Sequence, residues 1–215
     1  MRLISRFMRF FFHHFYHSFA WTYDFVAGVV SIGRWNDWIQ TIIPFIQGTN
    51  ILEIGPGPGY LQHLLRDRGL SIFGLDESMQ MIHLAKNRLE KADYKIISLA
   101  RGLAQTLPFP DAKFDSVIST FPSEYISDSK TLSEIRRVLR DNGQLIVLPA
   151  AWIVGRKFTD RAAAWLFQIT GEAPKNIFDI VTERFIQPLE QAGFSVKVRE
   201  VEIRSSIVLV LAAAK

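Results

Sequence analysis

A glycine-rich turn between an apolar strand and a helix start constrains this chain more than any other stretch. Residues 51–61 read Ile-Leu-Glu-Ile-Gly-Pro-Gly-Pro-Gly-Tyr-Leu, and the apolar run before the first glycine is typical of a buried strand. Gly55, Gly57 and Gly59 lack Cβ atoms, so the backbone can turn tightly and approach a ligand closely. A helix beginning near Pro58 would direct its unpaired N–H groups at that ligand. The stretch therefore predicts a site for a nucleotide-like cofactor.

Two acidic residues lie beside this turn. Glu53 ends an apolar strand, where a charge is costly unless it has a partner. Residues 70–76 predict a second strand that ends in Asp76, which follows Gly55 by 21 residues. A βαβ unit brings a carboxylate to ribose hydroxyls at this distance, and its two oxygens can both accept from a vicinal diol. The glycine spacing differs from the Gly-x-Gly-x-x-Gly dinucleotide fingerprint, and such a turn alone is often only a loop.

The combination of these motifs resembles the class I S-adenosylmethionine-dependent methyltransferases. The nearest branch contains the ubiquinone and menaquinone biosynthesis methyltransferases and many small-molecule and lipid methyltransferases. The resemblance covers roughly residues 50–150, with the motifs in the family's order. They are Glu53-x-Gly55-x-Gly57-x-Gly59, Gly-Leu-Asp-Glu-Ser at 74–78, Leu-Pro-Phe-Pro-Asp at 107–111, Phe-Asp-Ser-Val-Ile at 114–118, and the helix-to-strand stretch at 135–145.

The resemblance implies an α/β, Rossmann-like domain over residues 48–215, preceded by an N-terminal helical cap over residues 1–47. Its seven-stranded sheet is mostly parallel, carries helices on both faces and ends in an antiparallel hairpin. Residues 149–174 would form an insertion on the substrate side. The patterns place strands at 51–54, 70–76, 94–99, 115–120, 144–148, 194–202 and 206–212, and helices at 60–68, from Ser78, at 129–140 and at 177–192.

The resemblance also implies S-adenosylmethionine as the cofactor. Asp76 would take both ribose hydroxyls, Met81 would lie near the adenine, and Tyr23 would approach the amino-acid end of the cofactor. A packed aromatic ring at Tyr23 and a buried core methionine at Met81 are the structural alternatives. The predicted cofactor-binding residues are Tyr23, Glu53, Gly55, Gly57, Gly59, Asp76, Glu77, Met81, Leu103, Ala104 and Thr120.

One position departs from the family pattern. Leu103 stands where the family commonly has an Asp that accepts a hydrogen bond from the adenine amino group. A leucine side chain cannot accept this bond, so adenine recognition is left to backbone groups near Leu103 and Ala104, or to Gln105.

The loop after the fourth strand is expected to flank the transferring methyl group. Ligands of open α/β sheets bind outside the carboxyl ends of the strands, and residues 121–126 follow such an end. Thr120 and Phe121 would line the sulfonium side. Glu124 and Tyr125 are the candidate catalytic residues, as groups that orient the substrate or accept a proton. The structural alternative is an acid that caps a helix and a packed ring.

The first 20 residues combine six phenylalanines with arginines. At helical spacing, Arg2, Arg6, Arg9 and His13 share one narrow face, and apolar residues lie opposite. Such a helix suits either a membrane interface with anionic headgroups or packing on its own domain. The expected location is the cytoplasm, with peripheral contact at the inner face of the membrane if the first of these two alternatives holds. The expected partner is a small-molecule or lipid substrate.

Several other classes are disfavoured. There is no cysteine, so disulfides and thiolate metal sites are excluded, and the N-terminal histidines lack a carboxylate cluster; no metal is expected. The least polar run, residues 19–32, is too short to cross a bilayer and carries Asp24, and no signal-peptide cleavage site is evident. No basic-aromatic groove indicates nucleic-acid binding.

Two rival functions remain from the sequence. A nucleotide-dependent oxidoreductase would need a different glycine spacing. A non-catalytic relative that keeps the fold as a binding or scaffold module is favoured by Leu103 and by the lack of an obvious base. The oligomeric state and the methyl acceptor stay open.

Overall fold

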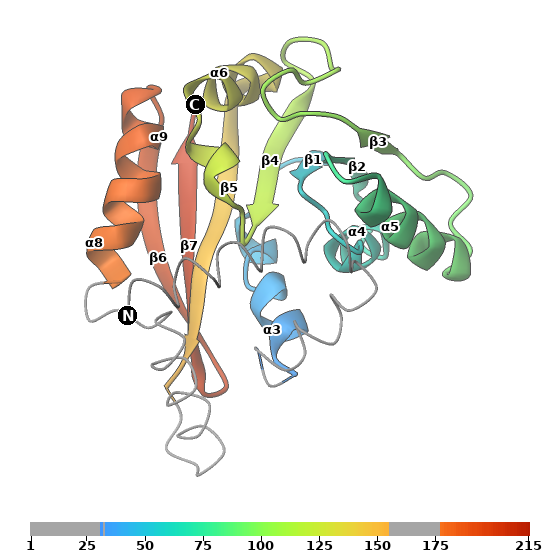
Figure 1. Ribbon diagram of the computed structural model, residues 1–215, viewed down its shortest axis with the longest axis horizontal. Helices are drawn as coiled ribbons and strands as arrows, with labels where there is room; N and C mark the ends of the chain where they lie inside the picture. The colour runs from blue at the N-terminus through green and yellow to red at the C-terminus, as the bar shows by residue number, and fades with distance from the viewer. Residues whose placement is uncertain (1–30, 32, 155–176) are drawn as a thin grey trace, which may run out of the picture.

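One seven-stranded sheet organises the chain (Figure 1), and the computed structural model describes residues 31, 33–154 and 177–215. The strand order is β3-β2-β1-β4-β5-β7-β6. Pairing is parallel from β3 through β5, whereas β7 pairs antiparallel with both β5 and β6. The predicted seven-stranded sheet with its C-terminal antiparallel hairpin is confirmed.

The elements follow in the order expected for alternating strands and helices. The strands are β1 Asn50–Ile54, β2 Ser71–Asp76, β3 Leu99–Arg101, β4 Phe114–Thr120, β5 Leu139–Ile153, β6 Ser195–Ile203 and β7 Ser206–Ala214. The α-helices are α3 Trp35–Gln40, α4 Tyr60–Arg66, α5 Met79–Lys91, α6 Ser129–Val138, α8 Ile177–Val181 and α9 Gln187–Gln191. Two short 3₁₀ turns are η2 Ile43–Phe45 and η3 Glu124–Ser127, and the π-helical turn η4 Thr182–Ile186 joins α8 to α9.

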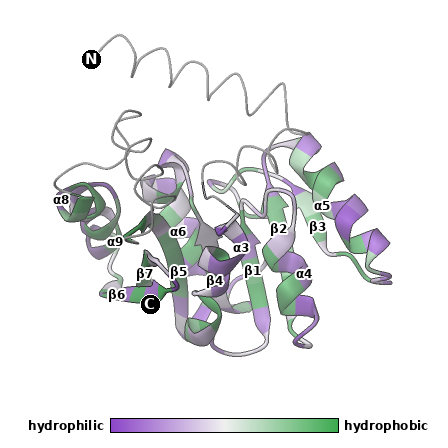
Figure 2. Ribbon diagram, turned by 90° about the horizontal axis from the view of Figure 1, so that it is seen from below, coloured by the Kyte–Doolittle hydropathy of each residue, from purple (hydrophilic) through white to green (hydrophobic). Residues whose placement is uncertain are grey.

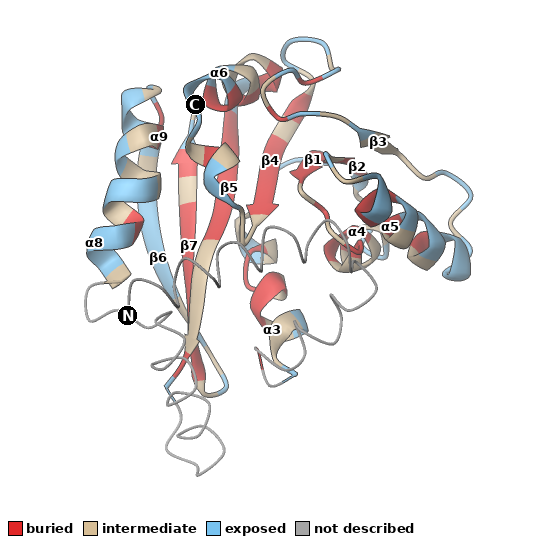
Figure 3. Cartoon of the chain, in the orientation of Figure 1, coloured by how far each residue is buried: buried red, intermediate tan, exposed pale blue. Residues whose placement is uncertain are grey.

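The sheet separates two hydrophobic cores. On one face, α6 and the α8–α9 helix pack on β1, β4, β5 and β7, with Leu52, Val117 and Leu132 among the buried residues. On the other face, α3 and α4 cover the strands, with Trp38 and Ile51 buried. The central strands are buried on both sides, whereas β6 at the sheet edge is mostly exposed (Figure 3). Hydrophobic residues accordingly concentrate in the strands (Figure 2), as in other parallel sheets covered by helices.

The third strand is shorter and later than the predicted span of residues 94–99. Its ladder with β2 begins where Gly74 pairs with Leu99. Upstream, the Arg66 guanidinium donates hydrogen bonds to the carbonyl oxygens of Ile72 and Ile96, at 2.9 and 2.8 Å. The Arg66 side chain thus binds the two carbonyl groups that a strand at residues 94–99 was expected to pair with β2. The Ile96 side chain is 76% exposed, so it does not pack into the core as a strand residue would.

The fifth strand is longer than predicted. The preceding helix ends at Val138 instead of residue 140, because Leu139 is already extended and pairs with Phe114. At its other end β5 continues to Ile153, which pairs with Ser206 of β7. The first residues of the predicted insertion, 149–153, therefore belong to this strand. Residues 155–176 and residues 1–30 lie outside the described residues.

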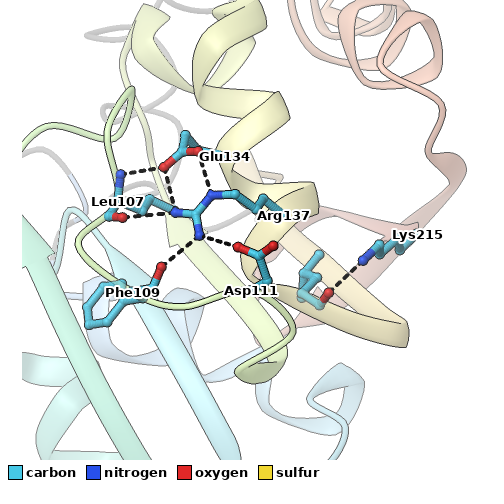
Figure 4. Close-up of polar contacts among 7 residues, drawn as sticks. Leu107, Phe109, Asp111, Glu134, Arg137 and Lys215 are labelled. Carbon is cyan, nitrogen blue, oxygen red and sulfur yellow. Dashed lines mark hydrogen bonds and ion pairs between the residues drawn. The ribbon is translucent and has the colours of Figure 1, made fainter.

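An arginine ties the loop before β4 to helix α6 (Figure 4). The Arg137 guanidinium donates to both carboxylate oxygens of Glu134, to a carboxylate oxygen of Asp111 and to the carbonyl oxygens of Phe109 and Leu107, at 2.7–3.0 Å. Glu134 also accepts from the Leu107 N–H at 2.8 Å. These bonds raise the pKa of Arg137 and lower the pKa of Glu134. The family-like Leu-Pro-Phe-Pro-Asp stretch is thus held by one planar donor group.

Replacing Arg137 should destabilise the fold. We expect Arg137→Ala to lower the free energy of unfolding by about 2–4 kcal/mol, because partly buried acceptors lose charged hydrogen bonds. Arg137→Lys should recover less than half of this loss, since an ammonium cannot reproduce the forked geometry. Urea denaturation measures both variants, with the exposed Lys130→Ala on the same helix as control. Full recovery in Arg137→Lys would show that charge alone matters.

Candidate functional site

The glycine turn has the backbone geometry that only glycine adopts readily. Gly55, Gly57 and Gly59 all have positive φ angles, of 73°, 52° and 81°. Helix α4 begins at Tyr60, as predicted, with Gly59 as its left-handed N-cap, and it ends at Arg66, two residues before the predicted end. A Cβ atom on Gly59 would lie 2.9 Å from the Cβ of Ala85, so the glycine also allows α4 to approach α5.

Asp76 lies at the end of β2 and faces this turn. One of its carboxylate oxygens accepts from the Gly57 N–H at 3.2 Å, and the other accepts from the Ser78 N–H at 2.9 Å. Burial raises the pKa of Asp76, while these two hydrogen bonds act in the opposite direction. A carboxylate has about four lone-pair positions, so acceptor capacity remains for a vicinal diol.

Glu53 is the most deeply buried acid of the site, with 1% of its surface exposed. Its carboxylate accepts from Gln62 Nε2 at 2.8 Å, and burial raises its pKa to about 7, with a further contribution from the charge of Asp76. The Gln62 Oε1 atom is buried without a hydrogen-bond partner among the described residues. None of the ion pairs of the described residues includes Glu53 or Asp76. The glycine turn therefore lies beside two acids, Glu53 and Asp76, that have no cationic partner among the described residues.

The two candidate catalytic residues have different surroundings. Glu124 is exposed and opens η3. The Tyr125 hydroxyl contacts Ser119 Oγ at 2.7 Å and the Ile54 carbonyl oxygen at 3.1 Å. Burial raises the pKa of Tyr125, and the charges of Asp76 and Glu53 raise it further. The phenol thus stays protonated near neutral pH, which favours a donor role over proton acceptance.

The other predicted cofactor residues line the carboxyl edge of the sheet. Met81 is buried near the start of α5, where the Ser78 side chain accepts from its N–H. Ala104 is buried, whereas Leu103 beside it is 47% exposed. Glu77 is exposed, Thr120 ends β4 and is half-buried, and Tyr23 lies outside the described residues.

Phe121 follows β4 in a left-handed conformation. Its φ angle is 48°, a strained value for a residue with a Cβ atom. Residues with such strained backbone conformations occur preferentially at functional sites. Its N–H donates to the Leu148 carbonyl oxygen at 2.7 Å, and its ring packs on Trp35 with centroids 4.5 Å apart. The neighbouring Trp38 ring lies at 6.2 Å. An aromatic wall therefore borders the end of β4.

The sequence analysis missed Gln62 and Ser119. Gln62 bonds to Glu53, and Ser119 contacts the hydroxyl of Tyr125. Both are polar residues with no exposed surface. Gln62 lies on the inner side of α4, and Ser119 interrupts an apolar strand. A polar residue within an apolar stretch could have identified both, because a buried polar group needs a hydrogen-bond partner.

The residues present fit S-adenosylmethionine on most counts. The turn allows close backbone approach, and Asp76 offers acceptors for a diol. Glu53 and Asp76 have no cationic partner in the part of the chain that the structure describes, so they suit a cation. Leu103 does not fit a side-chain bond to the adenine amino group. The described residues hold no cluster of metal ligands, and none of their helices is long and apolar enough to cross a membrane.

Glu53→Gln should stabilise the folded protein at alkaline pH. In the wild type the folded-state pKa of Glu53 lies above its ordinary value of 4.5, so stability is highest below that value and falls as pH rises to about 7. The loss amounts to about 3 kcal/mol above that pH. Glutamine has no charge to bury, and its amide can donate to Gln62 Oε1.

Urea denaturation between about pH 5 and pH 8 measures this effect. The matched control is Glu134→Gln, which removes an acid whose pKa is lowered by Arg137. Its contribution is present above the ordinary pKa and is lost as pH falls, so this variant should be less stable than the wild type at pH 8. Equal losses in both variants at that pH would contradict the assignment of Glu53.

Comparisons with known proteins agree on one family. Residues 52–147 match the family described as "Methyltransferase domain". The demethylmenaquinone methyltransferase of Thermotoga maritima is 30% identical over 145 residues, which cover 65% of this chain and 61% of that protein. The enzyme of the same name from Symbiobacterium thermophilum is 33% identical, over 63% of this chain and 57% of that protein. The chain thus spans about three fifths of the length of these relatives.

Solved structures agree with the fold. A crystal structure of a putative S-adenosylmethionine-dependent methyltransferase from Methanococcus maripaludis superposes with a TM-score of 0.65 at 21% identity, over 89% of this chain and 90% of that one. A crystal structure of such a methyltransferase from Aquifex aeolicus gives 0.60 at 21% identity, over 84% and 92%. The sheet order and these superpositions show that the chain has the fold of these S-adenosylmethionine-dependent methyltransferase structures, and its residues 52–147 are similar to the methyltransferase domain family.

Proposed function

We propose that this protein binds S-adenosylmethionine above the glycine turn and transfers its methyl group to a small hydrophobic acceptor. The observation that carries the proposal is Asp76, which is held by the N–H groups of Gly57 and Ser78 at the carboxyl end of β2. This position lets one carboxylate accept from both hydroxyls of a ribose.

The chain's own residues would bind, orient and exclude water. When bound, S-adenosylmethionine supplies a methyl group already activated on a sulfonium. Glu53 and Asp76 give the site a negative potential, and a nearby cation would favour the ionised form of Glu53. Thr120 and the aromatic wall of Phe121 and Trp35 would shield the reacting groups from water and hold the acceptor in line.

A hydrophobic acceptor is favoured by the rim of this site. Four large hydrophobic side chains are exposed at the carboxyl edge of the sheet: Met79, Leu103, Val154 and Phe178, at 43–49% of their surface. Phe178 belongs to this edge because its ring contacts Trp152 near the end of β5, with centroids 6.4 Å apart. Two relatives carry the name demethylmenaquinone methyltransferase, which gives a quinone precursor as their substrate. We infer that the acceptor here is a small apolar molecule of similar character.

The rival functions are less well supported. A nucleotide-dependent oxidoreductase is disfavoured by the match to a methyltransferase family. A scaffold role does not account for a buried Glu53 beside a half-buried Asp76, neither of which has a cationic partner among the described residues. Leu103 is the one feature that favours the scaffold, since it removes a hydrogen bond to the adenine.

Calorimetric titration tests the cofactor site directly. We expect micromolar binding of S-adenosylmethionine and S-adenosylhomocysteine and no binding of NAD. Asp76→Ala should weaken both by about 100-fold or more, because two hydrogen bonds to a charged group are lost. Asp141→Ala, which removes a fully exposed carboxylate, should bind like the wild type. Absence of binding in the wild type would leave the scaffold function.

We also propose peripheral membrane contact through residues 1–20. The motivation is their basic and phenylalanine-rich composition. Vesicles of phosphatidylglycerol and phosphatidylcholine should co-sediment the whole chain, and deletion of residues 1–18 should reduce the bound fraction several-fold. Vesicles of phosphatidylcholine alone are the control for the arginines. Equal sedimentation of both proteins on the anionic vesicles would contradict the proposal.

A further inference from the structure

The Tyr125 hydroxyl lies beside the glycine turn, and the proposed reaction leaves it without a role. It lies 2.7 Å from Ser119 Oγ and 3.1 Å from the Ile54 carbonyl oxygen. Ser119 Oγ donates to the same carbonyl at 2.9 Å. Three oxygen atoms therefore meet where β1 passes into the turn.

The Ile54–Gly55 peptide unit is held at both of its ends. Its carbonyl oxygen accepts from Ser119 of β4 and from Tyr125, and its N–H donates to the Leu75 carbonyl oxygen of β2 at 2.8 Å. The plane of this peptide is thus fixed between the two neighbouring strands. Gly55 takes its positive φ angle at this point, so the orientation of the peptide sets the direction in which the turn leaves the sheet.

Close packing makes the hydroxyl part of the turn. A Cβ atom on Gly55 would lie 2.8 Å from the Tyr125 hydroxyl oxygen, closer than real Cβ contacts come. Glycine at this position therefore serves the approach of Tyr125 as well as the backbone angle. Since burial keeps the pKa of this phenol high, the hydroxyl remains a hydrogen-bond donor over the physiological range of pH.

The same tyrosine belongs to the loop that borders the predicted acceptor side. It lies in η3, where the next residue, Ile126, is 2% exposed and anchors the turn in the core. Ser127 donates through its hydroxyl to the Arg184 carbonyl oxygen of η4. The hydroxyl of Tyr125 thus joins the cofactor turn to a segment that is fixed at two further points.

We propose that Tyr125 is a positioning residue, whose hydroxyl holds the Ile54–Gly55 peptide so that the glycine turn keeps its cofactor-binding shape. The proposal rests on the proposed cofactor site. It assigns Tyr125 a role through the backbone of Gly55, with no contact between Tyr125 and the reacting atoms. A base at this position would instead affect turnover while leaving cofactor affinity unchanged.

Titration of S-adenosylmethionine into variants of the whole chain tests this assignment. Tyr125→Phe keeps the ring and removes the donor, and we expect its dissociation constant to rise about three- to tenfold, the range for one neutral hydrogen bond. Ser119→Ala should give a similar rise. The double variant should rise by less than the product of the two, because both hydroxyls serve one carbonyl group. The ratio of Tyr125→Phe to wild type should stay constant from about pH 7 to pH 9, since the phenol keeps its proton there.

Ser116→Ala is the matched control. Ser116 is equally buried on β4, but its hydroxyl bonds with the backbone of Gln47 at the other end of the strand. This variant should lower the urea midpoint and leave the dissociation constant within about twofold of the wild type, since it removes a buried hydrogen bond outside the site.

The outcomes separate a failure of the positioning role from a failure of the proposed cofactor site. Wild-type affinity in folded Tyr125→Phe and Ser119→Ala would overturn the positioning role and leave the cofactor site intact, as would equal loss of affinity in Ser116→Ala. If Tyr125→Phe does not fold, Ser119→Ala decides alone. A wild type that binds no S-adenosylmethionine would overturn the proposed function, and this inference would fall with it.

Discussion

Burial of negative charge beneath the glycine turn is the constraint on which the rest of the site depends. Glu53 is almost completely enclosed, and its pKa of about 7 shows that its ionised form is disfavoured there. Asp76 lies nearby with its own pKa raised by burial. A fold selected for stability alone would have an apolar residue at such a position, since removing an unpaired charge from water is costly. Retaining these acids is consistent with a cationic ligand that compensates them when bound.

The sheet topology explains why these groups meet. Strands β1, β2 and β4 are parallel and adjacent, so their carboxyl ends lie together at one edge. Glu53, Asp76 and Thr120 each come from the end of one of these strands. The order of strands changes direction around β1, and the crevice at such a switch point is where open α/β sheets bind ligands. Helix α3 and the residue after β4 then close one side with aromatic rings.

Much of this arrangement could be predicted from the sequence because it rests on local signals. The glycine turn, the carboxylate after the second strand and the helix cap at Ser78 each depend on residues close together in the chain. Where a distant contact decides, prediction failed. The Arg66 side chain donates hydrogen bonds to the carbonyl oxygens of Ile72 and Ile96, and the third strand begins only at Leu99. Pairing with β7 likewise extended β5 beyond its apolar run. Such contacts follow from the packed structure and leave no periodic pattern in the sequence.

The position of Leu103 bears on how the site could select its cofactor. An acid there would contribute one hydrogen bond to the adenine, a contact that many nucleotides could share. The exposed leucine offers only apolar surface. Asp76 would hold the ribose, which many nucleotides also carry, so selection would rest on charge, through Glu53 and Asp76. Electrostatic attraction is stronger in a partly dry site than in water, so the buried Glu53 and the half-buried Asp76 can favour a cation over a neutral or anionic nucleotide without reading the base.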